Sequence, residues 1–177
     1  EYKNGDGELE LTAADRWILS RLQQTIQTVD DSIKSYRLDH MAHAVYEFTW
    51  NEYCDWYLEL SKTVLFDDNA SEAVKRGTRH TLVHVLETIL RLAHPTMPYI
   101  TEEIWQRIAP LAGLAASKTG ASSIMLQSYP EYNEANFDQS AIDEVEWIKN
   151  FIVGIRQIRS GMNIKPGKLL SVLLQNG

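Results

Sequence analysis

Basic side chains carry the most informative chemistry in this sequence. Seven of them gather in two stretches of the chain: Lys75, Arg76, Arg79, Arg156, Arg159, Lys165 and Lys168. Guanidinium and ammonium groups that recur at helical spacing, or that flank a turn, can contact successive phosphates of a nucleic acid. Ordinary solvated helix faces carry similar groups. The seven are therefore candidate RNA contacts, and the spacing alone leaves a plain charged surface open.

Histidine and carboxylate side chains form a second set of candidates. Two groups each share a helix face: His40, His43 and Glu47, and His80, His84 and Glu87. Either group could hold a metal ion on one helix, but partly exposed helix histidines are the simpler interpretation, and we expect no metal site. Asp55 and Glu59 lie one turn apart, and we expect them to form ion pairs rather than to do acid–base chemistry. The sequence also lacks Gly-x-Ser-x-Gly, His-Glu-x-x-His and Gly-x-Gly-x-x-Gly. We therefore expect no catalytic residue.

The distribution of charge bears on the partner. A formal net charge of −7 argues at face value against a nucleic acid. Residues 1–62, however, hold 6 Lys and Arg against 12 Asp and Glu, whereas residues 149–177 hold 5 basic residues and no acid. One end of the chain is electropositive while the rest repels polyanions, and such asymmetry can orient a nucleic acid on one face.

Composition indicates an ordinary globular protein. At 177 residues the chain can bury a real core. It has no run of about 18 apolar residues, which predicts no membrane span, and its polar, acidic N-terminus predicts no signal peptide. The single cysteine, Cys54, fits a reduced compartment. We expect a cytoplasmic protein with no membrane partner.

The central element of the predicted fold is a helix that is rich in aromatic residues. Five aromatic residues occur among the ten from Phe48 to Tyr57. Neither Gly nor Pro interrupts this stretch, and apolar residues recur at helical spacing on both sides of it. The pattern predicts a central helix over about residues 38–64 that is covered on more than one side. We expect Trp50, Trp56 and Tyr57 to be core residues rather than stacking platforms for bases.

Cap signals place two helices around this one. Thr12 with Asp15 forms a capping box at the start of a first helix, which ends near Tyr36. Ser71 can cap the helix that follows the aromatic one, and that helix stops at His94 because prolines follow. Short loops between such helices favour antiparallel neighbours.

Two more helices complete the predicted bundle. Pro98 is well placed as the first residue of a fourth helix, and Trp105 could close the corner between the third and fourth against the core. Ser140 with Asp143 forms a second capping box, which opens a fifth helix that ends near residue 160.

The predicted fold is therefore all-α, an antiparallel bundle of about five helices in residues 11–160. Residues 1–10 are predicted to be an irregular lead-in, and residues 124–129 a short extended segment across the bundle. Residues 161–177 are predicted to form a turn and then a strand over 169–174. Because a lone strand needs a partner, we expect this strand to be truncated and the chain to stop short of its natural end.

Six motifs occur in a fixed order over nearly the whole chain. They are Asp15-Arg-Trp-Ile-Leu19, Phe48-Thr-Trp-Asn51, Cys54-Asp-Trp-Tyr-Leu-Glu59, Arg76-Gly-Thr-Arg-His-Thr-Leu82, Leu92-Ala-His-Pro-Thr-Met-Pro-Tyr-Ile-Thr-Glu-Glu-Ile-Trp105 and Ile158-Arg-Ser-Gly-Met-Asn-Ile-Lys-Pro-Gly-Lys168. In this order they closely resemble the anticodon-binding domain of bacterial valyl-tRNA synthetases. The His-Pro-x-x-Pro pattern with its Glu-Glu-x-Trp is shared with leucyl and related class I synthetases, whereas the run from Trp50 to Glu59 favours the valine enzyme.

The resemblance implies a helical bundle that binds the anticodon stem-loop of valine tRNA. A separate catalytic domain would use ATP and Mg²⁺ to join valine to that tRNA. The catalytic motifs of the family, His-x-Gly-His and Lys-Met-Ser-Lys-Ser, are not in this sequence. The resemblance thus implies a fragment that holds no cofactor and cannot aminoacylate alone. Its implied partners are valine tRNA and the catalytic domain of the same enzyme, with no DNA, and we expect a monomer.

Two alternatives stay open. The chain could be the anticodon domain of an isoleucyl or leucyl enzyme, or a purely structural bundle that docks a catalytic domain or a partner helix. The acidic N-terminal half and the apolar residues 124–126 would suit docking.

Overall fold

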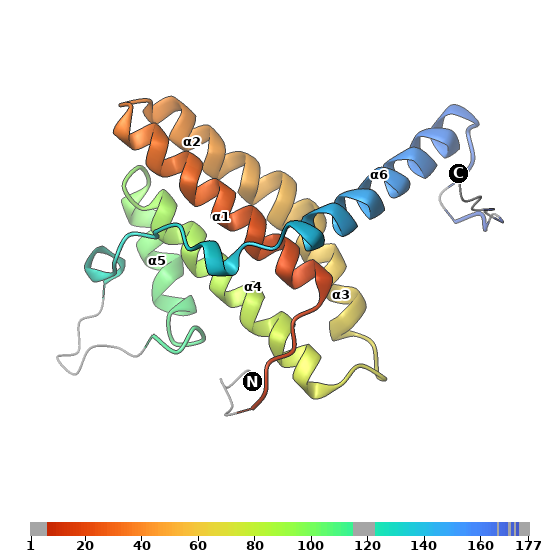
Figure 1. The fold of residues 1–177 in the computed structure, drawn as a ribbon, viewed down its shortest axis with the longest axis horizontal. Coiled ribbons are helices and arrows are strands. Elements are labelled where there is room, and N and C mark those ends of the chain that lie inside the picture. Colours follow the sequence, from red (N-terminus) through yellow and green to blue (C-terminus); the bar gives the residue numbers. More distant parts are fainter. Residues whose placement is uncertain (1–6, 115–122, 166, 170, 172, 174–177) are drawn as a thin grey trace.

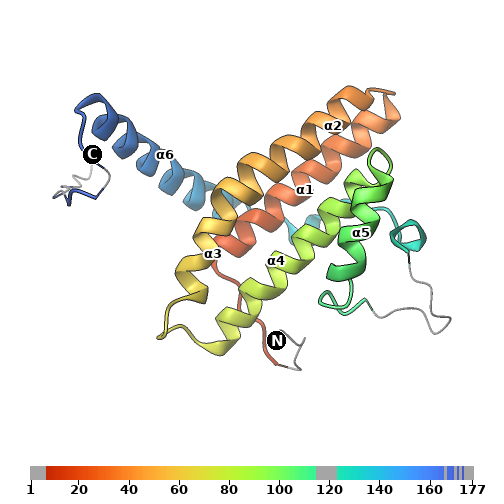
Figure 2. The same ribbon diagram turned by 180° about the vertical axis from the view of Figure 1, so that it is seen from behind.

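The computed structural model describes residues 7–114, 123–165, 167–169, 171 and 173, and these form an all-α bundle. In chain order the helices are α1 (Ala13–Lys34), α2 (Leu38–Glu47), the π-helix η1 (Phe48–Tyr57), α3 (Leu58–Leu65), α4 (Glu72–Ala93), α5 (Pro98–Ile108), the 3-10 turns η2 (Ile124–Leu126) and η3 (Glu134–Asn136), and α6 (Gln139–Gly161). Helices α1 and α2 lie side by side, α4 packs against α1 and α3, and α5 folds back on α4 (Figure 1, Figure 2). The first turns of α6 pack on α1, and the rest of α6 projects from the bundle (Figure 1).

The predicted helix starts are confirmed at three places. Thr12 Oγ1 accepts from the Asp15 amide at 3.2 Å while the Asp15 carboxylate accepts from the Thr12 amide at 2.8 Å, which completes the capping box of α1. Ser71 Oγ accepts from the amide of Val74 at the start of α4. Pro98 is the first residue of α5, where the amide hydrogen it lacks would have had no helical partner.

The aromatic helix is continuous from Leu38 to Leu65, but its middle is π-helical. The Leu58 amide donates to the carbonyl of Tyr53, five residues back, instead of four. Each turn of η1 therefore takes more residues, and positions at α-helical spacing no longer share one face. The expectation that Trp50 belongs to the core is wrong for this reason: its side chain is 56% exposed.

The other aromatic positions of η1 do face the bundle. Tyr57 is fully buried, as predicted, and Trp56 is half-buried against the core. The Tyr57 hydroxyl donates to the buried carboxylate of Asp15 at 2.5 Å, and Thr78 Oγ1 of α4 donates to the same carboxylate at 3.0 Å. Burial, and then the neighbouring Asp15, raise the pKa of Tyr57 far above its usual value. One carboxylate thus joins α1, η1 and α4.

A second polar contact closes the corner between α4 and α5. Trp105 is fully buried, as predicted, and its Nε1 donates to the carboxylate of Glu87 at 2.9 Å. Arg91 pairs with the same carboxylate at 2.8 Å and also donates to the carbonyl of Ser128. Because Glu87 is almost fully buried, these donors satisfy a charge that would otherwise be costly.

Gly77 permits the lead-in to lie against α4. The Glu10 amide donates to the carbonyl of Ala73, and a Cβ on Gly77 would lie 2.0 Å from the Glu10 carbonyl oxygen. Contact with backbone at that distance requires a residue without a side chain. The glycine is therefore needed for this close approach of two segments.

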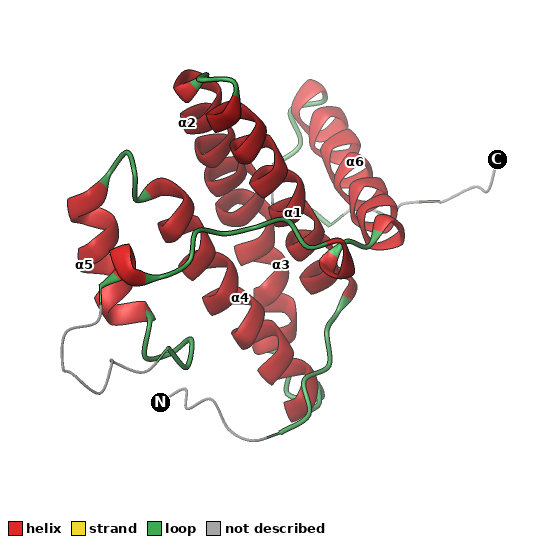
Figure 3. Cartoon of the chain, turned by 60° about the vertical axis from the view of Figure 1, so that its left-hand side comes forward, coloured by secondary structure: helices red, strands yellow, loops and turns green. Residues whose placement is uncertain are grey.

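The prediction for residues 124–129 is wrong at its start. Ile124–Leu126 form the 3-10 turn η2, because Ser123 Oγ accepts from the Met125 amide and donates to Glu102. The chain that follows has no regular structure and crosses α4 and α1 (Figure 3). Tyr129 anchors it through a hydrogen bond from its hydroxyl to the carbonyl of Leu92, at 3.1 Å.

Two expectations for the C-terminal third are also corrected. The cap of α6 is Asp138 and not Ser140, since the Asp138 carboxylate accepts from the Ala141 amide and pairs with Arg16. Leu169, Ser171 and Leu173 are not in a strand, because no described segment offers them a ladder partner. The remaining positions of the predicted strand, residues 170, 172 and 174, lie outside the described residues.

Candidate nucleic-acid interface

Three of the seven predicted RNA contacts lie in the first turns of α4. Arg76 reaches back to the lead-in and donates to the carbonyl of Glu8 at 3.3 Å. Arg79 lies 3.7 Å from the carboxylate of Glu72. Lys75 is half-buried on the same helix. Arg76 and Arg79 therefore each have a partner within the chain.

The other four lie at the projecting end of α6 and in the turn after it. The guanidinium of Arg159 donates to the carbonyls of Lys165 and Lys168, at 2.6 and 3.0 Å, and so folds the turn back on the helix. The Lys168 amide also donates to the Lys165 carbonyl, which confirms the predicted turn. Both lysines are exposed. Arg156 lies 5.6 Å above the ring of Trp56, which holds it on the bundle side of α6.

The structure does not bring all seven predicted RNA contacts together. The start of α4 and the end of α6 lie at different ends of the molecule in both views (Figure 1, Figure 2). They form two separate basic surfaces, and the one on α6 is the more open. The spacing of residues in the sequence reveals each cluster of basic residues but not the distance between the two clusters.

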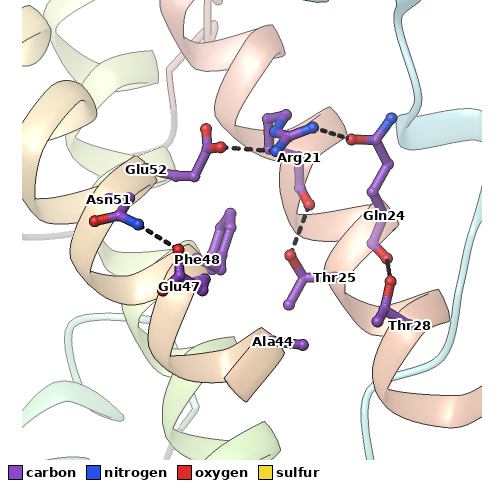
Figure 4. A pocket seen from close by; sticks show the side chains of 9 residues that line it. All are labelled: Arg21, Gln24, Thr25, Thr28, Ala44, Glu47, Phe48, Asn51 and Glu52. Atoms are coloured by element: carbon purple, nitrogen blue, oxygen red, sulfur yellow. Dashed lines mark hydrogen bonds and ion pairs between the residues drawn. The ribbon is translucent and has the colours of Figure 1, made fainter. Parts of the chain in front are cut away.

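A polar cleft that sequence reasoning missed lies between α1 and the α2–η1 junction. Its volume is about 380 Å³. The Arg21 guanidinium donates to Glu52 at 2.7 Å and to Gln24 at 2.6 Å at one end of the cleft, and an Asn51–Glu47 hydrogen bond forms one wall (Figure 4). These residues recur at helical spacing, but nothing in the sequence shows that the two rows face each other.

This cleft is tied to α6 through Glu52. Lys149 of α6 lies 3.8 Å from the Glu52 carboxylate and 2.7 Å from that of Glu146. Its ammonium group also lies over the rings of Trp17 and Trp56, at 4.9 and 5.5 Å. The basic helix is therefore fastened to the bundle beside the cleft.

Comparison with known families settles the class of the domain. The family described as the anticodon-binding domain of tRNA ligase matches residues 15–174. The chain belongs to this family. An anticodon-binding domain binds tRNA and is part of an aminoacyl-tRNA synthetase, so the basic surfaces and the cleft are candidate parts of an RNA interface. The predicted resemblance is confirmed at this level.

The histidine sets of this anticodon-binding domain are not arranged to bind metal. The rings of His80 and His84 stack with their centroids 6.0 Å apart, while Glu87 is engaged by Trp105 and Arg91. In the described ranges, no three His, Cys, Asp or Glu side chains come together in a group that could hold a metal ion. None of the described helices is long and apolar enough to span a bilayer.

The domain also carries an apolar groove of about 640 Å³ between α2, the end of α4 and α5. Its lining includes Met41, Val45, Ile89, Met97 and Ile100. Met97 and Ile100 are more than half exposed, as is Tyr46 at its rim. Exposed apolar surface of this kind is typical of contacts with protein.

Proposed function

We propose that the chain is the anticodon-binding domain of a valine-tRNA ligase and that it holds the anticodon stem-loop of valine tRNA. The observation that carries the general function is the family match over residues 15–174. The valine assignment is supported by the run from Trp50 to Glu59, which spans most of η1 and the start of α3 and supplies Tyr57 to the core.

The geometry supports contact with an RNA loop on the side of the bundle that carries α6. This helix projects from the bundle, and the turn that follows it carries two exposed lysines beside Arg159. Cations on a projecting helix can follow a phosphate backbone without steric conflict, while unpaired loop bases are read by hydrogen bonds and stacking. The surface at the start of α4 would contact more distant phosphates.

In the parent enzyme, ATP and Mg²⁺ would act in a separate catalytic domain, and the apolar groove between α2 and α5 favours a second role in docking protein. The rest of the assignment, a monomeric cytoplasmic enzyme with valine tRNA and its own catalytic domain as partners and no DNA, follows from the family resemblance.

The test is a titration of the 177-residue chain, isotopically labelled, with a valine anticodon stem-loop, alongside an isoleucine stem-loop. We expect the valine loop to bind more tightly, with shifts concentrated on α6 and its turn. With about four phosphate contacts, affinity should fall on the order of 100-fold between about 50 and 200 mM salt. Equal binding of both loops would remove the valine assignment. Weak salt dependence would favour the docking module instead.

A further inference from the structure

The polar cleft between α1 and the α2–η1 junction has the chemistry of a site for a single nucleobase. Its floor is apolar, formed by Phe48 and Ala44, and Phe48 stands between the two helices (Figure 4). Its rim is polar. A volume of about 380 Å³ falls within the range of roughly 300–1,000 Å³ that is usual for small-molecule sites.

The two carboxylates of the rim differ in their partners. Glu52 is held by Arg21 at 2.7 Å and lies 3.8 Å from Lys149, so its charge is compensated. Glu47 accepts a hydrogen bond from the side-chain amide of Asn51 and forms no ion pair within the described part of the chain. A carboxylate can accept about four hydrogen bonds. Glu47 therefore has acceptor capacity to spare at the wall of the cleft.

This chemistry selects against phosphate and for an amino group. Two carboxylates beside a single guanidinium disfavour an anion, so a phosphate is a poor occupant. A planar base with an exocyclic amino group fits better, because Glu accepts from the N4 amino group of cytosine and unstacked loop bases are read along their edges. Uracil would present the carbonyl O4 instead, and an acceptor facing a carboxylate is repelled.

We propose that this cleft takes one unstacked base of the anticodon loop and reads its exocyclic amino group through Glu47. The inference rests on the proposed function and deepens it. Valine anticodons end in adenine and cytosine, both of which carry an amino group, whereas isoleucine anticodons end in adenine and uracil. If the base is the cytosine, Glu47 discriminates between these two tRNAs.

The experiment measures binding of four stem-loops to the 177-residue chain and to Glu47→Gln. The loops are the valine loop, the valine loop with its last anticodon cytosine changed to uracil, the valine loop with its middle adenine replaced by unsubstituted purine, and the loop with both changes. The native chain should lose about tenfold in affinity, about 1.4 kcal/mol, when the base that is read loses its amino group. Whether the cytosine or the adenine change has this effect identifies the base.

In Glu47→Gln that loss should shrink to about twofold, because a neutral amide accepts from an amino group more weakly than a carboxylate does, and because it can also donate to O4 when the changed base is uracil. Glu59→Gln is the matched control. It removes the same charge from the same continuous helix, but from an exposed carboxylate that pairs with Lys62 at 2.6 Å. It should keep the native preference.

The outcomes separate the two proposals. If the native chain binds the stem-loops but treats all four alike, or if Glu47→Gln keeps the native preference, the cleft is not the base site, and the tRNA-binding function stands. If no stem-loop binds the folded chain even at low salt, the proposed function falls and the base site with it.

Discussion

Tyr57→Phe tests whether the buried Asp15 carboxylate joins α1, η1 and α4 energetically. The change removes one hydroxyl and its 2.5 Å hydrogen bond to Asp15 while it keeps the ring that fills the core. A hydrogen bond to a charged acceptor contributes about 1.5–3 kcal/mol. Asp15 retains three other hydrogen bonds, two from Thr12 and one from Thr78. All three reach Oδ2, so the change leaves the buried Oδ1 without its hydrogen-bond donor, and we expect a loss of at least about 2 kcal/mol.

Urea unfolding followed by circular dichroism measures this loss, and in a thermal scan it corresponds to a fall in Tm of about 4–8 °C. Tyr53→Phe is the matched control. It also removes a hydroxyl from a buried tyrosine of η1, but that hydroxyl donates at 3.1 Å to the neutral carbonyl of Leu82. Its removal should cost about 1 kcal/mol.

A Tyr57→Phe variant that is no less stable than Tyr53→Phe would refute the reasoning. A double-mutant cycle with Thr78→Val adds a second criterion. Tyr57 and Thr78 donate to the same carboxylate from different helices. Their effects should therefore be coupled by at least about 0.5 kcal/mol. Strict additivity would mean that the carboxylate does not act as a shared node.

Three further predictions concern packing, pH and RNA. Gly77→Ala should destabilise the fold by about 1–3 kcal/mol, because the new Cβ would lie 2.0 Å from the Glu10 carbonyl oxygen. Gly154→Ala on α6 is the control and should stabilise the fold slightly, because its Cβ would have nothing within 4 Å. The midpoints of urea unfolding compare the two variants. Burial, and then the neighbouring His80, lower the pKa of His84 from 6.5. His84 therefore binds a proton more readily in the unfolded chain than in the folded chain, so stability should fall as pH drops below about 6.5. His84→Gln should reduce that fall, which urea unfolding at several pH values measures. Arg159→Ala should release the 165–168 turn and weaken stem-loop binding. The slope of log affinity against log salt concentration should fall in magnitude by about 1, and an unchanged slope would exclude this surface from the RNA interface.

Local signals predicted most of the helix boundaries. A capping box needs only residues three apart in the chain, so Thr12 with Asp15 could be found without the fold. Pro98 is equally informative, because its fixed φ and missing amide hydrogen suit the first turn of a helix and nothing deeper. Where two cap residues compete, as Asp138 and Ser140 do, the choice depends on a tertiary partner. Arg16 of α1 lies 3.1 Å from Asp138, and no local pattern shows this.

The π-helix could not be predicted in the same way. Whether a backbone amide bonds four or five residues back depends on how the whole segment packs and not on the residue types alone. The sequence pattern predicts that Trp50, Trp56 and Tyr57 are all core residues, yet Trp50 is exposed while Tyr57 is buried. The candidate site could likewise be predicted only in part from the sequence. Its basic residues could be found by type and spacing, whereas the cleft required knowing that Arg21 and Glu52, far apart in the chain, face each other.

Glu52 connects the two parts of the proposed RNA surface. One of its oxygens binds Arg21 of α1, and the other lies 3.8 Å from Lys149 of α6. Only the first part of α6 is buried in the bundle, so the direction in which its basic end projects depends on contacts near Lys149. The carboxylate that helps to close the cleft therefore also helps to set where Arg159 and its turn lie. An RNA loop that contacts both the cleft and α6 would meet a surface whose two halves are joined through one side chain, and a change at Glu52 should disturb both halves together.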